Sequence, residues 1–312
     1  MAERLITSVG DMSCDLLCSP ISHLGDEDIQ IILEDLNLSP GGNSMNFALG
    51  AASFGARVTF HGAMGEDPLG TFLRRWMEKA KIKDHSRRLK GIRTSTTMSI
   101  PNLSGEKRLL TFPGANSTFT IEPEKVDIEG SAHVHYGGFW FTRKMAEGGV
   151  KTLFEACRDA GVETSLDPGT DPRGFRGKLL EYFLDLLPLT DIIMMNVDEI
   201  KEITGTRDIS KGANMMIGNG VKTVVVHKGD RGTSVIDENG RKNYPPYQVY
   251  VPRNPAGCGD VFNGCYVAAR LEGRDQDEAV EMGLAAAALH LASAEPYYPA
   301  RERIMQRVKR GK

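Results

Sequence analysis

A glycine-rich segment near the carboxyl end has the strongest chemical character in the sequence. Residues 254–260 read Asn-Pro-Ala-Gly-Cys-Gly-Asp, and a run of small and apolar residues typical of a helix follows. The N–H groups of a helix's first turn have no partner within the helix, and glycines let a phosphate approach the backbone. Gly257, Cys258 and Gly259 are therefore candidates for phosphate binding. A helix-stabilising role is the simplest interpretation of Asp260, but it does not explain the glycines on either side of Cys258.

A second glycine turn opens an earlier helical pattern. Gly41 and Gly42 precede this pattern, and Asn46 lies inside it. Turn chemistry at a strand–helix junction is a sufficient explanation for the glycines. It explains Asn46 less well, because asparagine is a mediocre helix former whose side chain both donates and accepts hydrogen bonds. The pattern indicates a residue that could hold a hydroxylated ligand at the start of the helix.

Strand-like and helical patterns alternate along the chain, which is typical of an α/β protein with a mainly parallel sheet and helices on both of its faces. Strands are expected at 5–9, 58–63, 134–136, 163–166, 191–195 and 221–226. Helices are expected at 43–54, 69–80, 147–160, 176–187, 209–217, 260–271, 275–292 and 301–309. Two segments, approximately 14–38 and 92–113, break the alternation, and we expect them to form a small β-sheet lid over a cleft. Because no linker divides the chain, residues 1–312 are expected to form a single domain.

The composition is that of a globular protein: of 312 residues, 40% are hydrophobic and 25% are charged. Lys and Arg number 38 and Asp and Glu 41, a formal net charge of −3, so the chain lacks the broad basic field of a nucleic-acid binder. No stretch approaches the ~20 apolar residues of a membrane helix, and the start shows no signal-peptide pattern. We therefore expect a cytoplasmic protein without nucleic-acid or membrane partners. The five scattered cysteines are expected to be reduced thiols.

Taken together, these motifs resemble those of the ribokinase-like (PfkB) family of carbohydrate and nucleoside kinases, in the family's order and over nearly the full length. The similar motifs are G-x-x-x-x-D at 10–15, G-G-x-x-x-N at 41–46, G-x-x-G-x-D-x-x-G at 62–70, F-P-G-A-N at 112–116, D-P-G at 167–169, N-x-x-E at 196–199, G-x-x-G at 229–232 and G-C-G-D at 257–260. A single match would be weak, whereas an ordered set rarely arises by chance.

The resemblance implies a phosphotransferase that moves the γ-phosphoryl group of ATP, with Mg²⁺, to a hydroxyl of a sugar, a related polyol or a sugar acid. Asp260 would act as the base. Its unperturbed pKa would be about 3.9, so it would orient the hydroxyl and take the proton late. The N–H groups of Gly257, Cys258 and Gly259 would form an anion hole for charge on the moving phosphoryl oxygens.

The same resemblance assigns residues to the acceptor. Asp15, Gly41, Gly42 and Asn46 would bind its hydroxyl groups. Arg173 lies roughly where some sugar-acid kinases of the family carry a substrate-binding arginine, which hints at a carboxylated acceptor.

Metal and nucleotide sites are also implied. Asn196 and Glu199 would hold Mg²⁺ through water, although the same pair fits a helix N-cap with Glu at the third position, and the two roles are compatible. ATP would contact Asn196 and the turn formed by Lys228, Gly229 and Gly232, with the adenine between this turn and the helix near 285–292.

The sequence departs from the family pattern at two places. Asn254 and Pro255 stand where an Asp-Thr pair commonly contributes to a monovalent-cation site, so the resemblance leaves a potassium requirement open. Cys258 replaces the usual alanine. A thiol at a helix N-terminus can be reactive, but a small buried side chain is the simpler interpretation.

Alternatives remain at this stage. A nucleoside kinase of the same fold would use Asp15 and Asn46 equally well to hold a free ribose. A non-catalytic sugar-binding sensor is the alternative from another class, and the intact Asp260 and glycine turn argue against it. Because family lids often pair across a dimer, a homodimer formed through the lid is among the assemblies that the resemblance implies.

Overall fold

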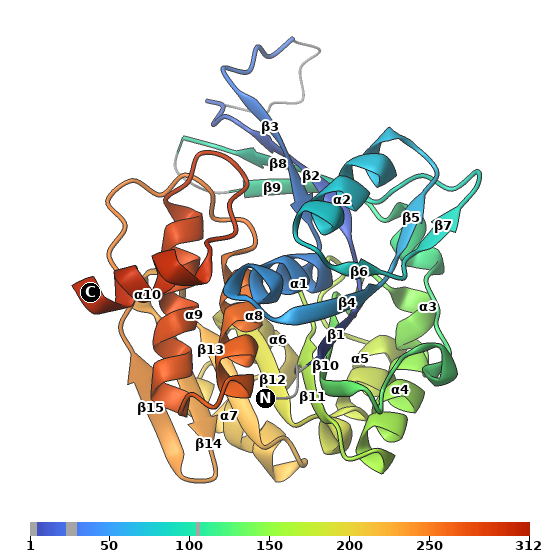
Figure 1. Ribbon diagram of the computed structural model, residues 1–312, viewed down its shortest axis with the longest axis vertical. Coiled ribbons are helices and arrows are strands. Elements are labelled where there is room, and N and C mark those ends of the chain that lie inside the picture. Colours follow the sequence, from blue (N-terminus) through green and yellow to red (C-terminus); the bar gives the residue numbers. More distant parts are fainter. Residues whose placement is uncertain (1–4, 23–29, 104–106) are drawn as a thin grey trace.

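A nine-stranded sheet runs through the centre of the computed structural model, which describes residues 5–22, 30–103 and 107–312 (Figure 1). Its strand order is β15-β14-β13-β12-β11-β10-β1-β4-β6, and the pairs from β13 to β6 are parallel. The strands are β1 (Leu5–Gly10), β4 (Arg57–His61), β6 (Lys83–Asp84), β10 (Ser131–Gly137), β11 (Glu163–Asp167), β12 (Ile192–Asn196), β13 (Thr223–His227), β14 (Thr233–Asp237) and β15 (Gly240–Tyr244). The predicted, mainly parallel sheet is confirmed.

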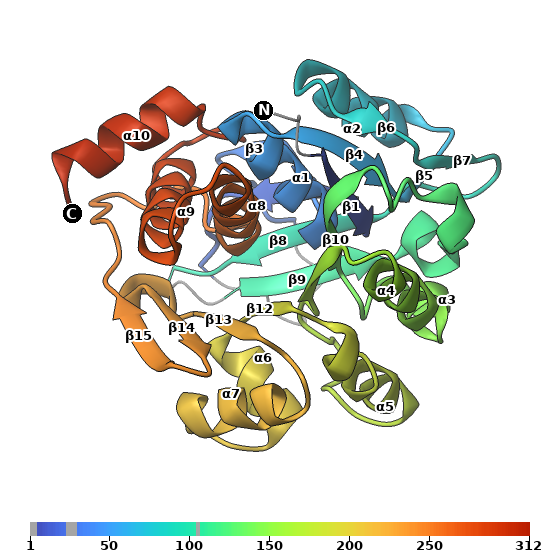
Figure 2. The same cartoon turned by 60° about the horizontal axis from the view of Figure 1, so that its bottom comes forward.

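Helices cover both faces of this sheet, as predicted (Figure 2). They are α1 (Asn43–Phe54), α2 (Pro68–Lys79), α3 (Arg143–Ala146), α4 (Gly149–Asp159), α5 (Lys178–Leu184), α6 (Val197–Thr204), α7 (Ile209–Gly218), α8 (Cys258–Leu271), α9 (Gln276–Leu291) and α10 (Arg301–Arg310). Two buried apolar clusters result, one on each face of the sheet, and β13 contributes side chains to both. Val225 belongs to the cluster with α1, α8 and α9, while Val224 and Val226 belong to the opposite one. This alternation is the two-residue period of a strand that is buried on both sides.

A smaller sheet, called the lid below, stands off the central one, as predicted (Figure 1). Its order is β3-β2-β8-β9, from β3 (Leu36–Gly41), β2 (Ser13–Cys18), β8 (Thr96–Pro101) and β9 (Lys107–Phe112). Residues 23–29 and 104–106 of the two predicted lid segments lie outside the described residues. The short strands β5 (Ala63–Gly65) and β7 (Arg87–Leu89) form a separate pair.

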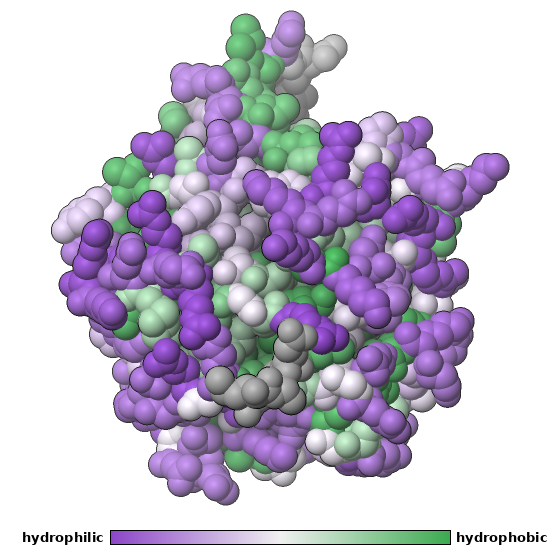
Figure 3. Space-filling model, viewed as in Figure 1, coloured by the Kyte–Doolittle hydropathy of each residue, from purple (hydrophilic) through white to green (hydrophobic). Residues whose placement is uncertain are grey.

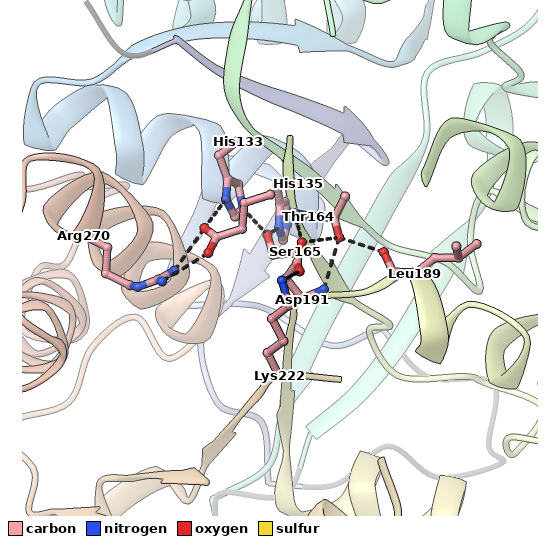
Figure 4. A network of polar contacts seen from close by, with 9 residues as sticks. His133, His135, Thr164, Ser165, Leu189, Asp191, Lys222 and Arg270 are labelled. Atoms are coloured by element: carbon pink, nitrogen blue, oxygen red, sulfur yellow. Dashed lines mark hydrogen bonds and ion pairs between the residues drawn. The ribbon is translucent and has the colours of Figure 1, made fainter. Parts of the chain in front are cut away.

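Helix α8, whose first turn contains Asp260, is tied to the central sheet at its other end. Arg270 in its last turn donates two hydrogen bonds of 3.1 Å to the carboxylate of Glu163, at the start of β11. The same carboxylate lies 3.0 Å from Nδ1 of the buried His133 on β10, and Ser165 bridges His133 and His135 (Figure 4). The network fixes the carboxyl end of α8 against β10 and β11. Because the helix is rigid, this also helps to place its first turn, which contains Asp260.

Three local features differ from the sequence expectations. The hairpin of β14 and β15 was not predicted, because its outer strand β15 is mostly exposed and lacks the apolar run of a buried strand. The expected helix at 147–160 begins after a break at Glu147 and Gly148, which separate α3 from α4. Helix α6 was not among the expected helices, although its capping pair, Asn196 and Glu199, was recognised. In the part of the chain that the structure describes, none of the helices combines the length and the apolar character needed to cross a bilayer.

Candidate active site

A cavity of about 610 Å³ lies between the carboxyl ends of the central strands and the inner face of the lid. Its floor is built by residues that end or directly follow strands, among them Asp11, Asp167, Asn196 and His227. Ligands of open parallel sheets bind at this edge, because the strands there end side by side and their connections diverge. The lid sheet adds Ser13, Asp15, Thr97, Leu109 and Thr111.

Asp260 lies at the cavity, and both of its carboxylate oxygens accept hydrogen bonds from α1. Nδ2 of Asn43 lies 3.1 Å from Oδ1 of Asp260, and Nδ2 of Asn46 lies 3.1 Å from Oδ2. Asn43 and Asn46 share a face of α1 because they are three residues apart. Two amide donors on α1 therefore hold the two oxygens of the Asp260 carboxylate on α8.

The environment of Asp260 favours proton uptake. Burial raises its pKa well above the ordinary value, and the negative charge of Asp11 acts in the same direction, while the hydrogen bonds from Asn46 and Asn43 oppose the rise. A carboxylate in this setting is a better proton acceptor than one in water.

Three titratable residues in the cavity wall, Asp11, Asp167 and His227, had no predicted role. Asp167 ends β11, and its Oδ2 accepts a hydrogen bond of 2.9 Å from Asn263 on α8. Burial raises the pKa of Asp167 well above its usual range, and the charges of Asp260 and Glu199 reinforce the effect. His227 lies 2.8 Å from Asn263, and burial lowers its pKa to about 4, so its ring is neutral.

The third residue, Asp11, follows β1 directly. Its Oδ1 accepts the backbone N–H of Ser44 at 3.0 Å, at the start of α1. Burial raises its pKa to about 6. Position at a strand end was the available signal for Asp11, Asp167 and His227. Asp11 and Asp167 also lie within the matched motifs at 10–15 and 167–169, which gave neither residue a role.

The glycine turn before α8 lies on the same cavity as Asp260. Gly257, Cys258 and Gly259 all line it, and Gly257 has a left-handed φ of 75°, which a side chain would disfavour. A Cβ at Gly257 would also lie 2.8 Å from Nδ2 of Asn46. The turn thus brings the first N–H groups of α8 to the cavity next to Asp260, an arrangement suited to binding an anion.

The predicted acceptor residues meet at the lid side of the cavity. Asp15 on β2 accepts a hydrogen bond of 2.8 Å from the hydroxyl of Ser13, and burial raises its pKa to about 6. Gly42 and Asn46 line the cavity with it. Gly41 is not among the described lining residues but lies against Asp15, because a side chain at this position would overlap the Asp15 carboxyl group.

Asn196 and Glu199 line the cavity and also cap α6. Oδ1 of Asn196 accepts the backbone N–H groups of Asp198 and Glu199 at 2.9 Å, and Oε2 of Glu199 accepts the N–H of Asn196 at 2.8 Å. Oε1 of Glu199 accepts a hydrogen bond of 3.0 Å from Thr170. Because both Glu199 oxygens already bind protein donors, this pair fits a hydrated Mg²⁺ held through water better than direct coordination.

The predicted nucleotide turn is partly at the cavity. Gly229 and Gly232 line it, together with Leu284 and Ala287 of α9 on another wall. Lys228 is not among the described lining residues, and its Nζ donates to Asn243 at 3.0 Å.

Arg173 lies away from the other predicted site residues. It lines a separate cavity of about 510 Å³ and lies 3.7 Å from the buried carboxylate of Asp171. The structure therefore does not bring Arg173 together with Asp15 and Asn46, and its role in binding an acceptor stays a prediction.

Comparison with known proteins agrees with this architecture. The chain is 24% identical over 317 residues to a ribokinase of Haemophilus influenzae, covering 97% of this chain and 98% of the relative. It is 26% identical over 232 residues to a fructokinase of Klebsiella pneumoniae, covering 72% and 74%. A solved structure of Arabidopsis thaliana ribokinase complexed with ribose and ATP superimposes with a TM-score of 0.83 at 22% identity, covering 99% of both chains.

An adenosine kinase from Sinorhizobium meliloti also has a TM-score of 0.83, at 18% identity and with complete coverage of both chains. At these identities the structural likeness shows the ribokinase-like fold. The family model described as pfkB family carbohydrate kinase matches residues 3–303, nearly the whole chain. The chain therefore belongs to the pfkB family of carbohydrate kinases.

Proposed function

We propose that this protein transfers the γ-phosphoryl group of ATP to a hydroxyl of an uncharged sugar or polyol, with Asp260 as the base. The observation that carries the proposal is the position of Asp260. Its carboxylate is held by two amide donors and lies at a cavity, and it directly follows the 257–259 turn, which lines the same cavity. Phosphoryl transfer requires alignment of the acceptor oxygen with the phosphorus and neutralisation of charge. The Asp260 carboxylate and the 257–259 turn provide one group for each requirement.

In this proposal, Asp260 accepts a hydrogen bond from the attacking hydroxyl and takes its proton as the new O–P bond forms. The raised pKa makes the carboxylate a competent acceptor late in the reaction. The N–H groups of Gly257, Cys258 and Gly259 would bind the phosphoryl oxygens. Asn196 and Glu199 would hold hydrated Mg²⁺, which supplies neutralising charge to the phosphates.

The charge of the cavity supports an uncharged acceptor. Five carboxyl groups line it: Asp11, Asp15, Asp167, Glu199 and Asp260. No lysine or arginine is among the lining residues in the described part of the chain. A sugar acid or sugar phosphate would bring a negative charge close to Asp15 and Asp11 without a cation to pair with it, which disfavours binding.

A coupled assay of ADP release tests the proposal. Purified protein with Mg²⁺ and ATP is screened against neutral sugars, polyols, sugar acids and sugar phosphates. We expect a neutral compound to be the best acceptor, and Asp260→Asn to lower kcat by about 10²- to 10⁴-fold. Asp275→Asn is the matched control, because this N-cap of α9 undergoes the same chemical change outside the cavity. Equal kcat in the parent and Asp260→Asn would exclude Asp260 as the base, and preference for an anionic acceptor would exclude the proposed substrate class.

A nucleoside is the second candidate acceptor. The apolar side chains of Phe141 and Leu109 line the same cavity as Asp15 and offer contact area for a nucleobase. The screen therefore includes adenosine, cytidine and uridine. A kcat/KM that favours a nucleoside over every free sugar would select this alternative.

We also propose that two copies pair through the outer face of the lid. Asp15, Thr97 and Thr111 point to the cavity, so their strand neighbours Leu16, Met98 and Leu110 point away from it. Figure 3 shows apolar side chains gathered on the lid, where Leu36, Leu110 and Phe112 are more than half exposed. An apolar face of this kind is typical of a surface that another molecule covers.

Light scattering after size exclusion tests this pairing. We expect a dimer for the parent and a monomer for Leu110→Glu. Leu184→Glu, at an exposed leucine of α5, is the control and should remain dimeric. A parent that is monomeric at micromolar concentration would contradict the proposal.

A further inference from the structure

Tyr298 connects the carboxyl-terminal part of the chain to the candidate base. It lies between α9 and α10, and its hydroxyl donates a hydrogen bond of 2.7 Å to Oδ1 of Asn46 on α1. Its ring packs edge-on against Trp76 of α2, with 5.9 Å between the ring centres. No sequence motif drew attention to this contact, which spans 252 positions.

The direction of this hydrogen bond follows from the chemistry of the groups. Burial raises the pKa of Tyr298 well above its ordinary value, and the charges of Asp15 and Asp260 add to the rise. The phenol therefore remains protonated and can donate. Because Oδ1 of Asn46 accepts from Tyr298, the NH₂ group of the same amide must face Asp260.

The Asn46 amide thus links Tyr298 to the Asp260 carboxylate. One oxygen of the Asp260 carboxylate accepts a hydrogen bond from Asn46, and the other accepts one from Asn43. The amide nitrogen of Asn43 also lies 3.4 Å from Oδ1 of Asp167. The Asn43 amide is therefore held by a second carboxylate, that of Asp167, whereas the Asn46 amide is held by the hydroxyl of Tyr298. Hydrogen bonds in such a chain polarise one another, so loss of the first weakens the second.

The segment that carries Tyr298 also approaches the glycine turn through His290. The buried His290, in the last turn of α9, lies between two carbonyl oxygens: Nδ1 is 2.6 Å from the oxygen of Tyr297, and Nε2 is 2.7 Å from that of Ala256. Ala256 directly precedes Gly257. His290 therefore contacts both the segment that carries Tyr298 and the glycine turn, and because burial lowers its pKa, the neutral ring donates to one of the two carbonyl oxygens.

We propose that Tyr298 is a positioning residue for phosphoryl transfer, which holds the Asn46 amide in the orientation that aligns the Asp260 carboxylate with the acceptor. This inference rests on the proposed function, because it assigns a task to Tyr298 only if Asp260 acts on an acceptor hydroxyl. Tyr298 itself does not touch the reacting atoms, so its effect on kcat must pass through Asn46.

A double-mutant cycle tests this dependence. Tyr298→Phe removes only the hydroxyl, and we expect it to lower kcat about tenfold while the KM for ATP stays within twofold. In the Asn46→Ala background, the same change should alter kcat by less than twofold, because the amide that transmits the effect is gone. A purely structural role would lower kcat in both backgrounds alike. Tyr297→Phe is the matched control: it removes the neighbouring phenol, keeps the backbone carbonyl near His290 and should leave kcat unchanged.

The outcomes separate the two proposals. If the parent phosphorylates no acceptor in the screen, the proposed function fails and the role of Tyr298 fails with it. If the parent is active and Tyr298→Phe retains full kcat, or loses the same factor in both backgrounds, the role of Tyr298 alone is overturned. Thermal unfolding verifies that each variant is folded. Should Tyr298→Phe not fold, Tyr298→Leu is put through the same cycle with the same criteria.

Discussion

The close packing of α1 on α8 sets the distance between Asp260 and its amide donors, and Gly264 makes that packing possible. Gly264 lies one turn after Asp260 on α8. A Cβ there would overlap the carbonyl oxygen of Phe47 and lie 2.7 Å from the backbone nitrogen of Ala51, both on α1. These are backbone atoms, which cannot rotate away as the end of a side chain can. We therefore expect Gly264→Ala to push the two helices apart.

The size of this displacement can be worked out from the contact distances. To reach the 3.4 Å of an ordinary contact, the 2.7 Å approach to Ala51 must lengthen by about 0.7 Å; this is the minimum, because the approach to the carbonyl oxygen of Phe47 is closer. The same movement would lengthen the 3.1 Å hydrogen bonds from Asn43 and Asn46 to Asp260 to about 3.8 Å, beyond hydrogen-bonding range. A misplacement approaching 1 Å lowers rates by about 10²-fold. Overpacking of a buried contact also costs about 1–3 kcal/mol of unfolding free energy.

Steady-state kinetics with the best acceptor, together with thermal unfolding, measure both effects. Gly218→Ala is the matched control, because Gly218 ends α7 and a Cβ there would meet open space. We expect it to retain full kcat and the stability of the parent, since alanine favours a helix over glycine. A Gly264→Ala variant with the kcat of the parent would refute the idea that this helix contact positions the base.

Three further outcomes follow from the cavity. Burial raises the pKa of Asp15 to about 6, so its carboxylate is ionised above that pH and protonated below it. The KM for the acceptor should therefore rise by up to about tenfold per pH unit below 6, and Asp15→Asn should abolish this dependence. Glu199→Gln should raise the Mg²⁺ concentration needed for half-maximal rate by about 10- to 100-fold, whereas an unchanged Mg²⁺ titration would leave Glu199 only its capping role. Cys258 is the most exposed of the five cysteines, so a maleimide should inactivate the parent, ATP should protect it, and Cys258→Ala should resist; full activity after stoichiometric labelling of Cys258 would contradict this.

Much of the fold was predictable because its signals are local. The apolar strands and the glycine turns before α1 and α8 are visible within about ten residues of sequence, and their order matched a known family. The lid sheet was predictable as a departure from the alternation. The hairpin of β14 and β15 was missed because its outer strand, Gly240–Tyr244, is mostly exposed and lacks the apolar run of a buried strand. The single-domain organisation and the lid boundaries stay predictions.

The candidate site was predictable only in part, because its contacts join distant positions. The sequence pointed to Asn46 as a ligand for hydroxyl groups, but it carried no signal that Tyr298 and Asp260 would occupy the two ends of its amide. Arg173 stays a prediction: the family resemblance hinted at an acceptor contact, and in the structure Arg173 lies beside Asp171 at another cavity. Side-chain direction in a loop is decided by tertiary contacts that spacing does not encode.

The use of amides rather than cations to hold Asp260 has a chemical consequence. A lysine or arginine beside the carboxylate would bind it more strongly, but would also lower its pKa by about 1–3 units and weaken it as a base. Asn43 and Asn46 donate hydrogen bonds without a formal charge, so burial still dominates and the pKa of Asp260 stays raised. Under the proposed function, the lack of lysine and arginine among the described lining residues would have two effects: it would preserve the basicity of Asp260 and disfavour anionic acceptors. Orientation and basicity of the carboxylate are thus separable, because neutral amide donors supply the first without reducing the second.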